Sequence, residues 1–312
     1  MHFDLISIGC LSLDTVYEVP ILPKSNSECF VKRLYEAHGG GAANVAAYAG
    51  FYGGLQVGLV SRIGNDKEGE DLITRMKQYN VCLEGVHRTK DHPISTRIAI
   101  ISDSDHNRTY LVYLGPINEL SVKDVPSGYV TDSTLFYVAP APPKVQQQFV
   151  EFAVERRKMI ALNPGKVYFE EGSKDEFRKL IRSVDFLFLN GSEALEYSNA
   201  DSPDEAGLIL QKLGAKRTII TLGRKGCIVC FDGKIKSYPG YRVEQIGSAG
   251  AGDAFAAGFL TEFTRTQNLD SAAISGNVFG AFSMTQHILR HPTPDKCGFS
   301  AFLSTVKQKN SL

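Results

Sequence analysis

The chain lacks both a net charge and any long hydrophobic run. Its 312 residues include 34 basic and 34 acidic side chains, so the formal charge at pH 7 is 0. A neutral chain has no bulk attraction for nucleic acid or for an acidic membrane surface, and we expect it to bind neither. No apolar run approaches the roughly 18 residues that predict a membrane-spanning helix. Residues 1–10 also lack the features of a signal peptide, so we expect a soluble, cytoplasmic protein.

Cysteine is scarce, and its arrangement predicts no disulfide framework. The six cysteines are scattered through a chain long enough to bury a large core, so reduced thiols are expected. Cys227 and Cys230 have CxxC spacing, but they lie in a segment with the composition of a buried strand. Side chains three residues apart on a strand point to opposite faces, so one metal ion does not easily collect both. We therefore expect both thiols to pack in the core.

Three common enzyme signatures are also missing. The sequence has no GxxxxGK(S/T), which disfavours a P-loop kinase. It has no clean GxGxxG in its first strand–helix unit, which disfavours a nicotinamide dehydrogenase. It has no GxSxG turn, which disfavours an α/β-hydrolase.

Short apolar runs alternate with helical stretches along most of the chain. This alternation predicts an α/β protein with a mostly parallel sheet covered by helices. We expect strands at 4–9, 56–60, 134–138, 159–162, 185–189 and 218–222. We expect helices at 42–52, 66–79, 144–157, 174–182, 204–213, 252–266 and 270–288.

Two stretches depart from this alternation. Residues 28–36 alternate as a strand with one covered face, and residues 96–102 and 108–114 flank a polar turn as a hairpin does. We expect residues 1–312 to form a single domain carrying a small β-sheet, built from about 15–37 and 94–115. A lid over a cleft and a plain edge hairpin explain that sheet equally well.

A glycine-rich turn opens the helix expected at 252–266. Gly250, Ala251 and Gly252 leave backbone N–H groups uncovered, where an anion can bind at the positive end of the helix dipole. Asp253 follows in the first helical turn as a candidate base, and we expect the helix N-terminus to lower the pKa of its carboxyl. Such a weak base suffices for phosphoryl transfer, which depends mainly on positioning. A tight turn with Asp253 as a helix cap is the alternative.

A second glycine run precedes a polar side chain that suits a sugar. Gly40 and Gly41 allow a ligand to approach the backbone closely, and Asn44 presents amide donors and an acceptor to hydroxyl groups. Asp14 follows the first predicted strand, at an edge where parallel sheets bind ligands. Helix capping for Asn44 and an ordinary loop position for Asp14 are the alternatives.

Two further segments pair a strand end with groups that suit a nucleotide or a cation. Asn190 and Glu193 stand three residues apart at a helix start and offer oxygen ligands for Mg²⁺, unless they only cap that helix. Thr221, Gly223 and Gly226 follow a later strand, where the turn suits contact with a nucleotide, and a simple β-turn explains it nearly as well.

In this order along the chain, the motifs resemble the PfkB family of carbohydrate kinases, which have the ribokinase-like fold. Residues 39–44 resemble its N-terminal signature, residues 249–255 its C-terminal signature, and residues 190–193 its NxxE motif. The resemblance implies a three-layer α/β/α fold with a small β-sheet lid. It also implies transfer of the γ-phosphoryl group of ATP, with Mg²⁺, to a hydroxyl of a small sugar or nucleoside.

The same resemblance implies roles for the motif residues. Asp253 acts as the base, and the amides of Gly250, Ala251 and Gly252 hold the migrating phosphoryl group. Substrate binding falls to Asp14, Gly40, Gly41 and Asn44, while Asn190 and Glu193 serve phosphate and Mg²⁺. The nucleotide site is lined by Thr221, Gly223, Gly226 and Asn277, the last of which core packing explains as well.

The sequence departs from the family pattern at two positions. Gly247 stands where many relatives carry an Asp that helps bind a monovalent cation, so we do not expect the usual potassium activation. Asn163 stands where many sugar-kinase relatives have Asp, which leaves the acceptor open. A ligand-binding relative without strong activity is the alternative function, and the intact Asp253 argues against it. Unpaired lid edges suit a homodimer, and a monomer fits the sequence equally well.

Overall fold

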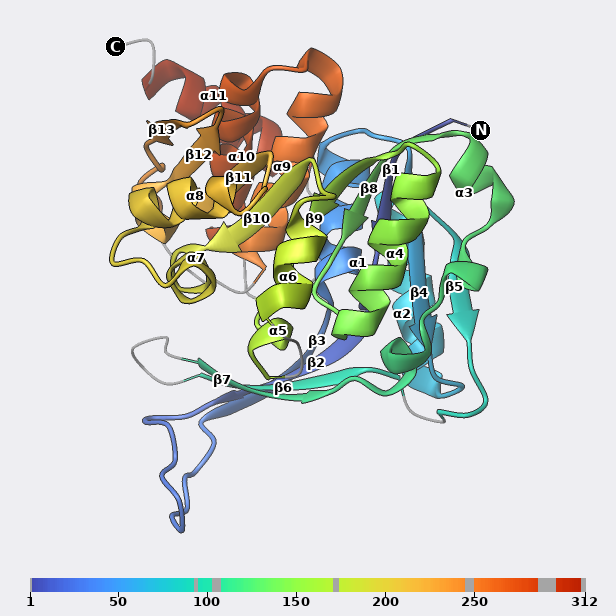
Figure 1. Ribbon diagram of the computed structural model, residues 1–312. Coiled ribbons are helices and arrows are strands. Elements are labelled where there is room, and N and C mark those ends of the chain that lie inside the picture. The colour runs from blue at the N-terminus through green and yellow to red at the C-terminus, as the bar shows by residue number, and fades with distance from the viewer. Residues whose placement is uncertain are drawn as a thin grey trace.

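A sheet of nine strands runs through the protein in the order β13-β12-β11-β10-β9-β8-β1-β4-β5 (Figure 1). The computed structural model describes residues 2–92, 95–102, 108–170, 174–244, 250–285 and 296–309. Seven strands are parallel, and the hairpin of β12 and β13 adds to one edge by antiparallel pairing. The strands are β1 (Phe3–Ile8), β4 (Val57–Ile63), β5 (Val81–Arg88), β8 (Ser133–Val138), β9 (Met159–Leu162), β10 (Phe186–Asn190), β11 (Arg217–Thr221), β12 (Cys227–Phe231) and β13 (Lys234–Tyr238).

Helices cover both faces of this sheet and enclose two separate apolar clusters. One cluster joins the sheet to α1, α2, α9, α10 and α11, and the other joins it to α3, α4, α6, α7 and α8. The expected α/β/α layers are therefore confirmed. The helices are α1 (Gly41–Ala47), α2 (Lys67–Met76), α3 (Ser127–Thr131), α4 (Pro143–Glu155), α5 (Val167–Glu170), α6 (Lys174–Ile181), α7 (Gly191–Ser198), α8 (Pro203–Lys212), α9 (Ala251–Thr266), α10 (Leu269–Met284) and α11 (Lys296–Lys309).

A separate four-stranded sheet lies beneath one end of the large sheet (Figure 1). Its order is β3-β2-β6-β7, formed by β2 (Ser12–Glu18), β3 (Arg33–Gly39), β6 (Arg97–Ser102) and β7 (Arg108–Tyr113). The hairpin of β6 and β7 was predicted, although its turn at 103–107 lies outside the described residues, as does residue 94. The strand expected at 28–36 begins instead at Arg33. Asp14 lies within β2 rather than in a loop, because β2 pairs with β3 and β6.

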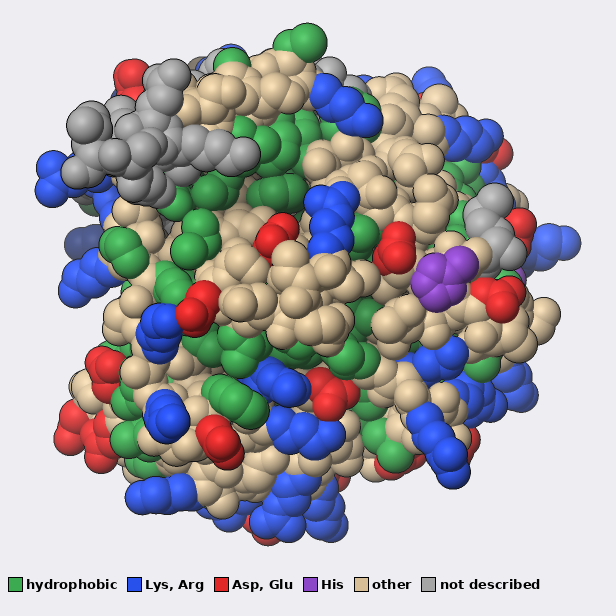
Figure 2. Space-filling model, turned by 90° about the horizontal axis from the view of Figure 1, so that it is seen from above, with side chains coloured by type: hydrophobic (Ala, Val, Ile, Leu, Met, Phe, Trp, Pro, Cys, Tyr) green, Lys and Arg blue, Asp and Glu red, His purple; other side chains and the backbone are tan. Residues whose placement is uncertain are grey.

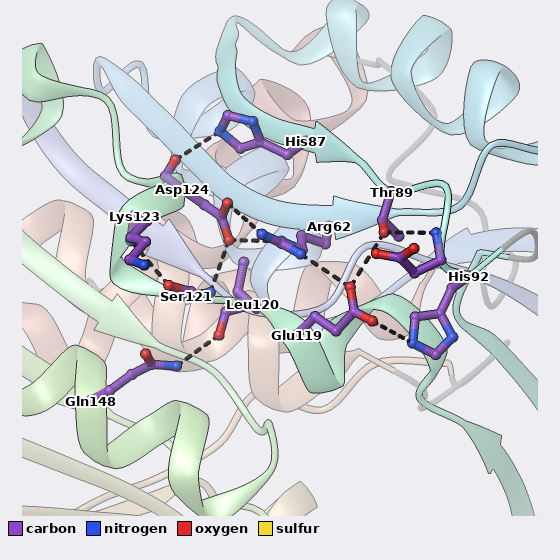
Figure 3. Close-up of polar contacts among 11 residues, drawn as sticks. Arg62, His87, Thr89, His92, Glu119, Leu120, Ser121, Lys123, Asp124 and Gln148 are labelled. Atoms are coloured by element: carbon purple, nitrogen blue, oxygen red, sulfur yellow. Dashed lines mark hydrogen bonds and ion pairs between the residues drawn. The ribbon is translucent and has the colours of Figure 1, made fainter.

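A polar network ties the large sheet to the segments that lead into and out of the small sheet (Figure 3). Arg62, near the end of β4, donates to both carboxylate oxygens of Asp124, at 2.8 and 3.0 Å. It also pairs with Glu119 at 3.2 Å, just beyond β7. Glu119 in turn contacts His92 at 2.9 Å and Thr89 at 3.3 Å, in the segment between β5 and β6. The segment that leads into β6 and the segment that leaves β7 are therefore anchored at one point.

The remaining expectations concern the surface and the cysteines. Acidic and basic side chains both occur across the face drawn in Figure 2, in keeping with the balanced composition. Within the described segments, no helix is long and apolar enough to cross a membrane. Cys227 and Cys230 are both buried on β12, as predicted for core residues.

Candidate active site

The first turns of α1 and α9 meet where the parallel strands end. Asn44 of α1 donates from Nδ2 to Oδ2 of Asp253 in α9, at 2.8 Å. Gly41 faces the same carboxylate, because a Cβ added there would lie 3.5 Å from Asp253 Oδ1 and 3.3 Å from Pro140, just beyond β8. The fold thus brings together two motifs that lie 209 residues apart in the sequence.

The turn before α9 has a conformation that glycine allows. Gly250 is the N-cap residue in the left-handed region, with φ at 75°, and no side chain caps this helix end. The first N–H groups of a helix have no partner within the helix, and α9 is 16 residues long, so its N-terminus is a site of positive potential. Gly252 is exposed, and a Cβ added there would meet nothing within 4 Å. The turn therefore offers open amides to an anion.

Asp253 differs from expectation in the direction of its pKa shift. Desolvation by burial raises the pKa of its carboxyl to about 6, the hydrogen bond from Asn44 lowers it, and the nearby Glu193 raises it further. The expectation of a lowered pKa is therefore wrong, because desolvation has the largest effect on this carboxyl. A carboxylate of this pKa is a stronger base than an ordinary aspartate and still ionised at neutral pH.

Asp14 lies on β2, is only 4% exposed and receives a hydrogen bond from Ser12 Oγ at 2.7 Å. Burial raises the pKa of Asp14 to about 7, the Ser12 bond lowers it, and Asp253 raises it. The glycine run fits around this carboxylate, since a Cβ at Gly39 would collide with Asp14. A Cβ at Gly40, where φ is 98°, would collide with the carbonyl of Cys10. The glycines therefore allow the close approach of β3 to β2 and β1.

A cavity of about 500 Å³ adjoins the turn before α9. All four residues expected to line a nucleotide site lie in its wall, together with basic side chains that were not predicted to be part of the site. Arg224 and Lys225 lie between Gly223 and Gly226, in the turn that the sequence predicted to contact a nucleotide, whereas Arg242 belongs to no motif. The lining residues are Thr221, Gly223, Arg224, Lys225, Gly226, Gly240, Tyr241, Arg242, Val243, Ala251, Gly252, Phe255, Asn277, Gly280, Ala281 and Met284.

Asn277 also supports the wall of that cavity. Its Nδ2 donates to the carbonyls of Tyr238 and Pro239, each at 3.2 Å, and its side chain is 7% exposed. These bonds attach α10 to the end of β13, just before the cavity-lining residues 240–243. Asn277 thus combines a packing role with its place in the lining.

Asn190 and Glu193 form a reciprocal capping box at the start of α7. The backbone N–H of Glu193 donates to Asn190 Oδ1 at 2.9 Å, and the backbone N–H of Asn190 donates to Glu193 Oε2 at 3.0 Å. Burial raises the pKa of Glu193, and its bonds to Asn190 lower it. No group of three or more metal-ligating His, Cys, Asp or Glu side chains occurs among the described residues. Capping is therefore the role that the contacts display.

Of the two positions that depart from the family pattern, the structure describes only Asn163. Gly247 lies outside the described residues. Asn163 follows β9, and its Oδ1 accepts the backbone N–H of Gly165 at 3.0 Å, which closes the turn before α5.

Comparison with known proteins agrees with this geometry. The chain matches the pfkB family of carbohydrate kinases over residues 3–296. It is 31% identical to a cytidine kinase from Thermococcus kodakarensis over 278 residues, covering 88% of this chain and 93% of that protein. It is 27% identical to a nucleoside kinase from Methanothermobacter thermautotrophicus over 292 residues, covering 94% and 93%. The fold matches that of Arabidopsis thaliana ribokinase complexed with ribose and ATP, with a TM-score of 0.81, 20% identity and coverage of 97% and 99%.

Proposed function

The chain belongs to the pfkB family of carbohydrate kinases and is a sugar or nucleoside kinase. We propose that it transfers the γ-phosphoryl group of ATP to a hydroxyl of a neutral ribonucleoside. One observation carries the proposal. Asp253 directly follows Ala251 and Gly252, which line the 500 Å³ cavity, and its carboxylate accepts a hydrogen bond from Asn44 of α1. A base between a donor site and an acceptor site is the arrangement that a direct transfer needs.

The donor lies in the cavity, with its phosphates toward the turn before α9. Arg224, Lys225 and Arg242 bring positive charge to the cavity wall, which suits a polyphosphate. The amides of Ala251 and Gly252 face the γ-phosphoryl group and neutralise the charge on its oxygens during transfer. Because no Cβ fills the space at Gly252, a phosphoryl oxygen approaches the backbone directly.

The acceptor lies between the small sheet and α1, where Asp14 accepts hydrogen bonds from its hydroxyl groups. The reacting hydroxyl gives its proton to Asp253 as its oxygen bonds to the γ-phosphorus. The bond from that phosphorus to the β–γ bridging oxygen breaks, and ADP leaves with the electron pair. The names of the cytidine kinase and the nucleoside kinase support a nucleoside as the first acceptor to test.

Mg²⁺ fits this site chiefly through the donor. Glu193 supplies a carboxylate, but its Oε2 is already held in the capping box, and no cluster of three acidic or His ligands occurs in the described part of the chain. A cation that keeps its waters and binds phosphate oxygens suits such a site, with Asn190 and Glu193 as outer partners. When bound, it offsets negative charge on the β- and γ-phosphates.

The small sheet acts as a lid over the acceptor. Asp14 projects from β2 on the same face as Ala37 and Ile98, so one side of this sheet presents a polar group toward Asp253. On the opposite face, Leu34, Leu111 and Tyr113 are exposed. An exposed apolar sheet face is suited to a second copy of the chain, and we include a homodimer through this face in the proposal.

Release of ADP from Mg-ATP tests the function against a panel of ribonucleosides, ribose, fructose, sugar phosphates and sugar acids. We expect release that depends on a ribonucleoside, and we expect Asp253→Asn to lower kcat by about 10²-fold or more while nucleotide binding persists. Asp232→Asn makes the same chemical change in an exposed turn and should leave turnover normal. If no acceptor class stimulates release, the alternative of a sugar- or nucleotide-binding protein is favoured.

A further inference from the structure

Asn44 contacts the proposed base, Asp253, directly. A residue that only binds the acceptor would not need this contact. Its backbone N–H is bonded to the carbonyl of Gly40 in the first turn of α1. Its side chain reaches Asp253 Oδ2 at 2.8 Å. In the described part of the chain, this is the only side-chain hydrogen bond found for the Asp253 carboxylate.

The two oxygens of Asp253 have different surroundings. Oδ2 faces the amide of Asn44, which in turn lies close to Gly250, because a Cβ added at Gly250 would lie 3.5 Å from Asn44 Nδ2. Oδ1 faces Gly41, which has no side chain. The carboxylate is therefore held on one side and open to a ligand on the other.

We propose that Asn44 is a positioning residue for the base, holding Oδ2 of Asp253 so that Oδ1 receives the proton of the acceptor hydroxyl. This inference rests on the proposed function for its catalytic meaning. In that step the acceptor O–H bond breaks, its proton goes to Oδ1, and the oxygen bonds to the γ-phosphorus as ADP leaves. Fixing a carboxylate by one oxygen orients the other toward the reacting proton.

The same hydrogen bond affects the charge of the base. An N–H donor stabilises a carboxylate more than a neutral carboxylic acid, so the Asn44 bond opposes the effect of burial on Asp253. The titratable groups that interact with Asp253 in the described part of the chain are Glu193, Asp14, Cys10, Tyr48 and Tyr137, and none of them is basic. Loss of the amide therefore leaves the Asp253 carboxylate without its main stabilising contact, and its pKa rises.

Two substitutions at Asn44 separate this role from simple acceptor binding. Asn44→Leu keeps the approximate shape of the side chain and removes the hydrogen bond, while Asn44→Asp replaces the donor with a second carboxylate. We expect the acid limb of the kcat–pH profile to move upward by about one pH unit in Asn44→Leu, and further in Asn44→Asp. We also expect kcat at pH 7 to fall by about tenfold or more, even at saturating acceptor.

The control is Gln147→Leu, which removes an amide-to-carboxylate bond to Glu151 at 2.9 Å on the exposed surface of α4. It should leave both the acid limb and kcat unchanged. If Asn44→Leu raises only the KM for the acceptor and leaves the acid limb in place, the positioning role is wrong.

A direct titration of Asp253 by carboxyl ¹³C NMR, without any substrate, keeps the inference testable apart from turnover. We expect its midpoint to rise in the order wild type, Asn44→Leu, Asn44→Asp. An unchanged midpoint in folded Asn44→Leu, verified by circular dichroism, would overturn the contact itself. A wild-type chain without acceptor-dependent ADP release would instead refute the proposed function while leaving this titration valid.

Discussion

At the scale of single residues, two carboxylates define the chemistry of the site, the buried Asp14 and the partly exposed Asp253. Burial raises the pKa of Asp14 to about 7 and that of Asp253 to about 6, and the negative charge of Asp253 raises the pKa of Asp14 further. A carboxyl pKa raised toward neutral pH means that the folded protein stabilises the charged form poorly. Ordered binding groups of this kind reduce stability in exchange for function.

Asp14→Asn is therefore expected to stabilise the protein at alkaline pH while it impairs acceptor binding. The unfolded pKa of Asp is about 3.9, and the folded pKa of Asp14 is about 7. The folded state thus binds the proton more tightly, so stability is lost as pH rises from about 4 through 7. Replacing the carboxyl with an amide removes this loss, and we expect Tm at pH 8 to rise on the order of 3 °C.

Calorimetry at pH 4 and pH 8 checks this sign. At pH 4 the wild-type Asp14 is protonated in the folded state, so the two proteins should melt at similar temperatures. Equal Tm values at both pH values, or a lower Tm for Asp14→Asn at pH 8, would contradict the burial of a poorly stabilised charge.

At the scale of elements, the sequence predicted helix and strand positions well and the contacts between them less well. The glycine turn at Gly250 and the strand at β9 follow from local residue types, so both were predictable. Local residue types did not predict that Asp14 lies in a strand. Its strand, β2, is stabilised by pairing with β6, more than 80 residues away along the chain. The direction of the Asp253 pKa shift depends on burial by distant segments, which no local pattern contains.

The Arg62 network illustrates an element-scale role that local patterns did not indicate. Arg62 connects β4 to Asp124, which is 5% exposed, and to Glu119 (Figure 3). Removing one member of a buried ion pair leaves an uncompensated charge. Since Arg62 and Glu119 are partly exposed, we expect Arg62→Met to lower the free energy of unfolding by about 2–3 kcal/mol.

Urea denaturation measures that loss. The control is Arg178→Met, which breaks an exposed pair with Asp175 at 3.1 Å on α6 and should cost less than about 0.5 kcal/mol. A loss for Arg62→Met no larger than that of Arg178→Met would show that the network does not anchor the connections to the small sheet.

At the scale of the whole molecule, the large sheet carries the site and the small sheet leaves apolar surface uncovered. Nine strands place the ends of β1, β8 and β10 beside α1, α7 and α9, where the proposed donor and acceptor meet. The small sheet is built from only four strands, and no described helix lies over Leu111, which is 61% exposed. Large exposed apolar side chains on one sheet face are typical of an interaction surface.

We expect the wild-type chain to sediment as a dimer and Leu111→Glu to sediment as a monomer in analytical ultracentrifugation. A glutamate in a symmetric apolar interface is buried twice, once from each copy, and each buried charge loses its contact with water. Ile274→Glu is the matched control, because Ile274 is 48% exposed on α10, away from the small sheet, and should leave the dimer intact. The dimer proposal is wrong if the wild-type chain is a monomer at micromolar concentration, or if the dimer survives Leu111→Glu. In either case the small sheet would act as a lid without a second copy on this face.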